Sequence, residues 1–143
     1  MKLSKHITLL LSSFMLISLL TQSGCKKDEP TPQDIIKQNL VGSLWRIKSV
    51  TVDGVDQTSM YSGMTIQFTA TTYSTTQGRV IWPASGSWRF VSTDGSLVRD
   101  DGLELTIAVT NTTLDIDLFW PERDIGGGRS NALSGNHTFS FTK

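Results

Sequence analysis

The sequence predicts an all-β protein, a small antiparallel up-and-down β-barrel of about seven or eight strands with one short helix before it. From residue 44 onward the apolar residues recur with a period of two, which is the repeat of a strand and not of a helix. The segments between turn signals follow one another closely, which leaves no crossover helix long enough for a parallel pair. Charged residues make up only 18% of the chain, and Thr, Ser and Gly are plentiful, a composition that suits β-structure.

The first 24 residues predict a secretory signal peptide. A basic head at residues 2–6 precedes a mostly apolar run over residues 7–20. That run is shorter than the roughly 20 residues that a membrane-spanning helix needs. Ser23 and Gly24 then precede Cys25, the only cysteine of the chain. This stretch resembles a bacterial lipobox, and the resemblance implies cleavage before Cys25 and an acylated anchor on that residue. A secreted protein with one free thiol is the alternative.

Residues 25–31 are expected to form the lipidated cysteine and a short polar tether. The run Lys26-Lys27-Asp28-Glu29 resembles the surface-export signal of Bacteroidota lipoproteins, which implies an outer-membrane protein that faces outward. A plain solvated tether is the other interpretation. Without residues 1–24 the chain keeps 11 basic and 13 acidic residues, a net charge of −2 that does not suggest nucleic acid as a partner. One domain is expected over residues 32–143.

The helix is predicted at residues 32–38. Thr31 can cap its first turn, Pro32 suits the first helical position, and Asp34 is favourable near a helix N-terminus. We expect the helix to end near Gly42 and to flank one end of the barrel.

The first strand is predicted to bend. Trp45 and Ile47 share one phase over residues 44–52, and the apolar phase then shifts to Val50 and Val52. Such a slip implies a bulge near Ser49, as in strands that curl into barrels.

The later segments alternate in the same way and are separated by turns. Strands are predicted around residues 64–69, 72–76, 86–90, 103–110, 114–120 and 137–142, with a long glycine-containing loop at 121–134. The apolar residues 80–83 are expected at an edge or corner, because Pro83 cannot donate to a central ladder. The sequential turns and the bent first strand favour a barrel over a sandwich.

Several of these segments, in this order, are similar to the lipocalin-like domain of Bacteroidota lipoproteins. They are residues 40–45, 52–56, 82–88, 98–102 and 133–139. The resemblance implies a barrel related in shape to lipocalins and carries no known activity with it. It also implies a Trp–Arg contact that seals one barrel end, for which Trp45 with Arg129 or Arg123 are the candidates.

Catalytic and metal chemistry are not expected. His137 is the only histidine after residue 24, and Cys25 is assigned to the lipid, so no nucleophile–base pair is evident. Asp115 and Asp117 share a face opposite the apolar residues of their strand and are expected to face water, so neither a metal nor a cofactor is assigned.

Aromatic residues are the strongest candidates for a binding site. Trp82 and Trp120 each precede a proline where a barrel mouth is expected, and with Tyr73 and Phe90 they form the predicted site for a small apolar or glycan ligand. In the alternative these rings cap the core. A filled barrel of this kind is an accessory module that presents loops 53–63 and 121–134 to a protein partner. The volume inside the barrel separates the two functions.

Overall fold

A computed structural model describes residues 29–121 and 133–143 of the chain. Cys25, Arg123 and Arg129 lie outside these ranges, so the predictions that concern them stay predictions. In the described residues nine strands occur: β1 (Leu44–Val52), β2 (Val55–Asp56), β3 (Thr65–Phe68), β4 (Thr72–Thr76), β5 (Ser85–Phe90), β6 (Ser96–Arg99), β7 (Glu104–Val109), β8 (Thr113–Trp120) and β9 (Gly135–Thr142).

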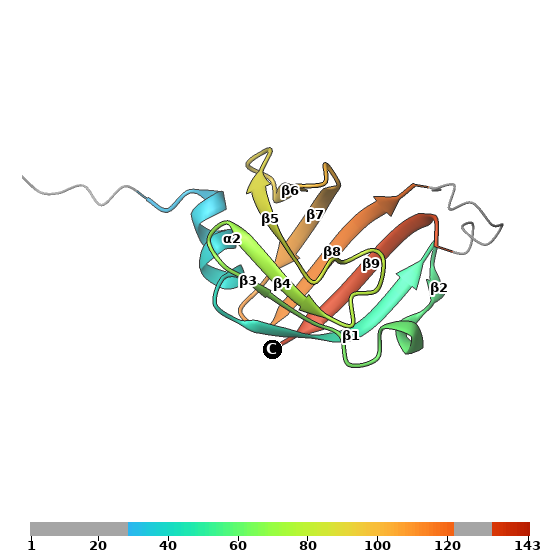
Figure 1. Ribbon diagram of the computed structural model, residues 1–143. Helices are drawn as coiled ribbons and strands as arrows, with labels where there is room; N and C mark the ends of the chain where they lie inside the picture. The colour runs from blue at the N-terminus through green and yellow to red at the C-terminus, as the bar shows by residue number, and fades with distance from the viewer. Residues whose placement is uncertain (1–28, 122–132) are drawn as a thin grey trace, which may run out of the picture.

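The strands confirm the predicted barrel. Each strand from β3 onward pairs antiparallel with the next, and β9 pairs back with β1, so that eight strands close on themselves (Figure 1). β2 is an additional short strand that pairs only with the end of β1. Closure through consecutive hairpins removes the free sheet edges that an open sheet of this length would expose.

The predicted helix is confirmed as α2 (Pro32–Leu40), which is two residues longer than expected. Thr31 accepts a hydrogen bond from the Asp34 amide at 3.2 Å, and the Asp34 carboxylate accepts one from the Thr31 amide at 2.9 Å. This reciprocal capping box satisfies two otherwise free amides at the start of the helix. Gln33 donates to the carbonyl of Ser92 at 2.9 Å, so the helix is fastened over one end of the barrel.

The bend in β1 is also found where the sequence predicts it. The register between β1 and β9 shifts between Ile47 and Ser49, while Trp45 and Val50 are both fully buried. The extra residue lets one strand keep its apolar side chains inward on both sides of the bend. β1 can therefore pair with β3 at its start and with β9 along most of its length.

The two ends of the barrel differ in what covers them. At the helix end lie α2 and the turns that lead into β4, β6 and β8. At the opposite end, called the loop end here, lie β2, the 3-10 helix η1 (Thr58–Tyr61) and the connections at residues 77–84 and 100–103. Figure 1 shows α2 and β2 at opposite ends of the barrel.

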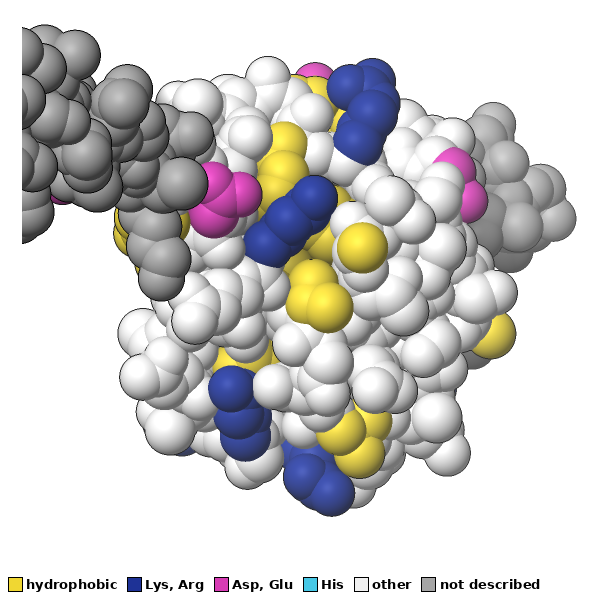
Figure 2. Space-filling model, turned by 90° about the vertical axis from the view of Figure 1, so that its left-hand side faces the viewer, with side chains coloured by type: hydrophobic (Ala, Val, Ile, Leu, Met, Phe, Trp, Pro, Cys, Tyr) yellow, Lys and Arg dark blue, Asp and Glu magenta, His cyan; other side chains and the backbone are white. Residues whose placement is uncertain are grey.

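The core fills the space between these ends. It is dominated by aromatic and branched side chains, and Trp45, Trp82, Tyr61, Phe68, Phe139 and Phe141 are its largest fully buried members. On the face seen in Figure 2, apolar side chains gather in a few small groups between Lys and Arg side chains. Scattered exposure of this kind is ordinary for a soluble surface.

Candidate functional site

The connection between β4 and β5 turns inward at the loop end, and we call residues 77–84 the plug loop. Ile81 and Trp82 are buried within the barrel, whereas Val80 is half exposed. Gln77 and Arg79 each adopt a φ of 55°, in the left-handed region that few residues other than glycine occupy. The loop thus reaches its inserted position through two unfavourable backbone conformations.

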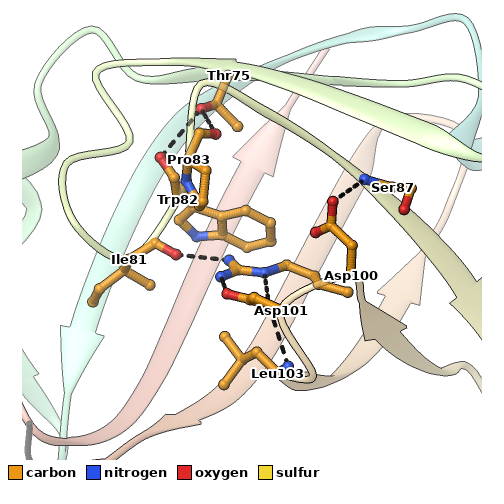
Figure 3. A network of polar contacts seen from close by, with 9 residues as sticks. Thr75, Ile81, Trp82, Pro83, Ser87, Asp100, Asp101 and Leu103 are labelled. Atoms are coloured by element: carbon orange, nitrogen blue, oxygen red, sulfur yellow. Dashed lines mark hydrogen bonds and ion pairs between the residues drawn. The ribbon is translucent and has the colours of Figure 1, made fainter.

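Thr75 holds the two arms of the plug loop together. Its amide donates to the carbonyl of Ala84 at 2.9 Å. Its hydroxyl donates to the carbonyl of Pro83 at 2.8 Å (Figure 3). Inside the loop the Trp82 amide donates to the Gly78 carbonyl at 3.1 Å. These bonds fix the shape of the loop. They do not attach it to the other parts of the barrel, and other residues make that attachment.

Two arginines attach the plug loop to the rest of the barrel. Nε of Arg79 donates to the carbonyl of Met60 in η1. Nη1 of Arg99 donates to the carbonyl of Ile81 at 2.6 Å. Among the described residues these are the hydrogen bonds that join the plug loop to elements other than β4 and β5.

Arg99 is a cation inside the barrel. It ends β6, its side chain has no exposed surface, and its guanidinium forms an ion pair with Asp101. The guanidinium carbon lies 5.1 Å from the ring centroid of Trp82 and 5.9 Å from that of Tyr73. A planar guanidinium can stack on aromatic faces while it keeps its hydrogen bonds. Arg99 is thus held between the Ile81 carbonyl, to which it donates, and the Asp101 carboxylate; Figure 3 shows Ile81, Trp82 and Asp101 close together around this point.

Aromatic rings run through the interior from the loop end to the helix end. The ring-centroid distances along this row are 5.1 Å for Tyr61–Phe139, 6.0 Å for Phe139–Trp82, 5.7 Å for Trp82–Tyr73, 6.3 Å for Tyr73–Phe68, 6.0 Å for Phe68–Trp88 and 5.3 Å for Trp88–Phe90. Most of these pairs are edge-to-face, a favourable arrangement for aromatic rings. Protein side chains therefore occupy the axis of the barrel.

Among the residues that the structure describes, four buried polar atoms in this row of rings or beside it lack a hydrogen-bond partner. They are the hydroxyls of Tyr61 and Tyr73, Nε1 of Trp82 and Nδ1 of His137. Buried polar atoms nearly always have partners, so such a group calls for a ligand, water or another explanation. Trp82, Tyr61 and His137 all contact the ring of Phe139, which places three of the four residues around one side chain.

The hydrogen-bonding roles of these atoms can be assigned. Nε2 of His137 lies 2.8 Å from the Leu133 carbonyl, which can only accept, so Nε2 carries a proton and Nδ1 is the ring nitrogen left without a partner. Burial raises the pKa of both Tyr61 and Tyr73, so both phenols stay protonated at neutral pH and can donate or accept. Nε1 of Trp82 can only donate.

The hollows on the outside of the barrel have a different character. One, of about 430 Å³, lies across β6–β9, and another, of about 480 Å³, lies across β3–β5; both are lined largely by polar side chains of the outer face. In the first, Phe119 is 58% exposed. Asp115 and Asp117 point to this outer face, as predicted, and accept hydrogen bonds from Ser140 and Thr138.

The structure brings together only part of the predicted ligand site. Tyr73 and Trp82 are in contact, and both are at most 2% exposed. Phe90 lies at the helix end of β5 and packs on Trp88, and Trp120 ends β8, where it pairs with Gly135. The binding role of these residues stays a prediction.

Sequence reasoning missed Arg99 and Tyr61 at the site. A signal for Arg99 was present, because Leu97 and Arg99 fall in the same phase of a strand. Its inward direction could have been read from that alternation. Tyr61 comes from a single turn of 3-10 helix, which has no comparable periodicity.

Trp45, which was predicted to seal one end of the barrel, has a structural role among the described residues. Its Nε1 donates to the carbonyl of Leu40 at 3.1 Å, and Nζ of Lys143 lies 5.1 Å from its ring centroid. The indole therefore ties the end of α2 to the start of β1. Arg129 lies outside the described residues, so its pairing with Trp45 stays a prediction.

No group of three or more His, Cys, Asp or Glu side chains suited to a metal ion occurs in residues 29–121 and 133–143. Within the same ranges no helix is long and apolar enough to cross a membrane. No protein-family model, curated protein or solved structure matches this chain.

Proposed function

We propose that this protein is a lipid-anchored binding protein of the bacterial outer membrane, facing outward, whose lipocalin-like barrel takes a small apolar or glycan ligand at the loop end. The observation that carries the binding role is the set of four buried polar atoms without partners on Tyr61, Tyr73, Trp82 and His137. A buried donor or acceptor that lacks a hydrogen-bond partner lowers the stability of the fold by about 1–3 kcal/mol. A ligand that supplies the missing bonds would recover that free energy.

The chemistry of the region supports binding and gives no support to catalysis. Aromatic faces surround the polar atoms, a combination suited to a molecule with both ring or hydrocarbon surface and a few hydroxyl or carbonyl groups. His137 already donates through Nε2 to a backbone carbonyl and stacks on Phe139. We therefore assign the protein no enzymatic reaction.

The proposed location rests on the sequence. The apolar run of residues 7–20, the small residues before Cys25 and the charged run after it support a lipidated N-terminus on the outer membrane. In this arrangement residues 26–31 are the tether. Six extended residues reach about 20 Å, so the barrel would stay close to the membrane surface.

A second function, the filled accessory module, is favoured by the row of ring contacts along the barrel axis. If rings and ordered water satisfy the interior by themselves, the barrel is a rigid scaffold. It would then present residues 53–63 and 121–134 to a protein partner. Water molecules do fill small polar gaps in protein interiors.

Native mass spectrometry of residues 26–143, purified gently from the host, separates the two functions. This chain keeps every described member of the core cluster, which lies within residues 36–141. We expect an additional mass that leaves on denaturation and is lost in Tyr61→Phe/Tyr73→Phe, which keeps both rings and removes two hydroxyls. The control Phe119→Ser changes only an exposed side chain on the outer face and should retain the mass.

A clean apo mass for the wild-type chain, together with a 1:1 protein complex captured on the intact cell surface by crosslinking, would overturn the ligand-binding role. An added mass that the double variant retains and Phe119→Ser loses would move the site to the outer groove. Lipid attachment is tested separately by the mass of the full-length protein from membranes, since Cys25→Ser should abolish the acyl mass and release the protein.

A further inference from the structure

We propose that the plug loop places the side chain of Trp82 in the ligand-binding site of the barrel. A neutral ring-bearing molecule with both a hydrogen-bond donor and an acceptor binds there by displacing Trp82. The inference rests on the proposed function and adds how the site opens and which chemistry it accepts. It starts from the indole of Trp82, which is 1% exposed, touches Tyr73 and Phe139, and yet leaves its Nε1 without a partner.

The inserted loop is held in a way that favours exchange. Gln77 and Arg79 both sit at a φ of 55°, a conformation that a non-glycine residue leaves readily when its surroundings allow. Two hydrogen bonds fasten the loop to the barrel wall, one from Arg79 to η1 and one from Arg99 to the Ile81 carbonyl. Withdrawal of the indole breaks no hydrogen bond at Nε1, and in water that atom gains one.

The walls left behind by Trp82 define the ligand. They are the ring of Tyr73, the ring of Phe139 and the guanidinium of Arg99, each of which would lose an aromatic neighbour when the indole leaves. A planar ring replaces those contacts best, because edge-to-face and cation–π contacts both need a π system.

The charge around the site selects a neutral molecule. Arg99 is the cation at the site, and its charge is already balanced by Asp101. Its Nε and Nη1 already donate to Asp101 and to the Ile81 carbonyl, so Arg99 offers little attraction to an anionic ligand. Nδ1 of His137 has no partner and can accept a hydrogen bond from a hydroxyl group of a neutral ligand. The hydroxyls of Tyr61 and Tyr73 can each donate to or accept from the same molecule.

Three probes that share one ring system test this chemistry on residues 26–143. 2-Naphthol is neutral at pH 7 and has a hydroxyl, 2-naphthoate is an anion, and naphthalene has no polar group. We expect 2-naphthol to bind at least tenfold more tightly than the other two by titration calorimetry or fluorescence. Fluorine NMR of the 5-fluorotryptophan-labelled chain should show the Trp82 resonance, assigned with Trp82→Phe, moving toward its solvent-exposed position on binding.

Loop variants with opposite expected effects test the displacement. Arg79→Ala removes the tie to η1 and should strengthen 2-naphthol binding severalfold. Gln77→Gly relieves the left-handed strain of the inserted state and should weaken binding severalfold. Arg89→Ala, on the outer face of β5, is the matched arginine control and should leave binding unchanged.

Several results would overturn the inference without touching the proposed function. If 2-naphthol binds while the Trp82 resonance and both loop variants stay at wild-type behaviour, the lumen binds ligand and the plug loop is not displaced. If 2-naphthoate binds as tightly as 2-naphthol, the neutral-ligand assignment is wrong. If none of the probes binds, even to Arg79→Ala, while the native chain still carries a co-purified mass, the inferred ligand class is wrong and the binding role stands.

Discussion

Replacing Gly86 by alanine tests whether the interior is as tightly packed as the ring contacts indicate. Gly86 lies directly opposite Tyr73 across β4 and β5. A Cβ built on it would lie 2.6 Å from the Tyr73 hydroxyl oxygen and 2.8 Å from two of its ring carbons. Ordinary contact distances are about 3.5–4.0 Å, so the ring has to move by roughly an ångström.

The expected loss of stability follows from the neighbours of Tyr73. The ring cannot retreat freely because Phe68, Trp82 and Arg99 contact it from other sides. Overpacking of this kind costs about 1–3 kcal/mol. Replacing glycine by alanine returns about 0.4–1 kcal/mol by restricting the unfolded chain, and Gly86 is not among the glycines with positive φ. The midpoints of these two ranges give a net loss of about 1.3 kcal/mol, between limits of about 0 and 2.6 kcal/mol. The midpoint corresponds to a fall in Tm of roughly 5–10 °C for a domain of this size.

Urea and thermal unfolding of Gly86→Ala and Ser85→Ala provide the measurement. Ser85 is the exposed neighbour on the outer face, and its replacement should change stability by less than about 0.5 kcal/mol. In a Tyr73→Leu background the ring is gone, so the added methyl should cost nothing or stabilise. A Gly86→Ala chain more stable than the wild type, or an unchanged cost in the Tyr73→Leu background, would refute the packing argument.

Three further predictions follow from the polar contacts. Arg99→Ala should lower the free energy of unfolding in urea by about 2–4 kcal/mol. The loss is smaller than for a fully buried ion pair because the Asp101 side chain is partly exposed to water. A loss below about 1 kcal/mol would contradict a structural role for the buried guanidinium. The backbone and side-chain amides of Asn136 donate to Asp53 and hold its pKa below the usual value, so the stability they provide is complete above about pH 4 and lost as the pH falls through the folded pKa. Asp53→Asn should therefore show a flatter loss of stability below about pH 4 than the wild type, and parallel acid-unfolding curves would exclude this contribution. Thr31→Ala removes the capping box and should weaken α2 by about 1 kcal/mol. Amide hydrogen exchange should become faster in residues 35–38 and change little in β8. Equal acceleration in both places would mean that the helix and the barrel open together.

Local chemistry explains why much of the fold could be predicted. Alternation over residues 103–110 and 114–120 decides which side chains face inward, because a strand presents successive residues to opposite sides. The slip between Ile47 and Val50 marked the bulge, and the Thr31–Asp34 spacing marked the helix start. Each of these signals acts between residues that are close along the chain.

The candidate site could be predicted only in part. Tyr73 was singled out by its aromatic character, and Trp82 by its aromatic character and the proline that follows it; these two do meet in the barrel. The sequence did not show whether these side chains point into the barrel. Residues 77–84 have no periodic pattern that would distinguish a loop crossing the rim from a loop entering the interior. Arg99 was passed over, although its strand phase points inward.

By itself the sequence determined the strand phases, the turns, the bend of β1 and the cap of α2, because these depend on residues within a few positions of one another. Only the tertiary structure decided that Trp82 enters the barrel, that Arg99 lies beneath it, and that Tyr61, Tyr73 and His137 keep unpartnered polar atoms around the same rings. These residues come from η1, β4, the plug loop, β6 and β9, and closure of the barrel brings them together. A contact across a closed barrel depends on the register of every strand between its partners, which no local pattern specifies.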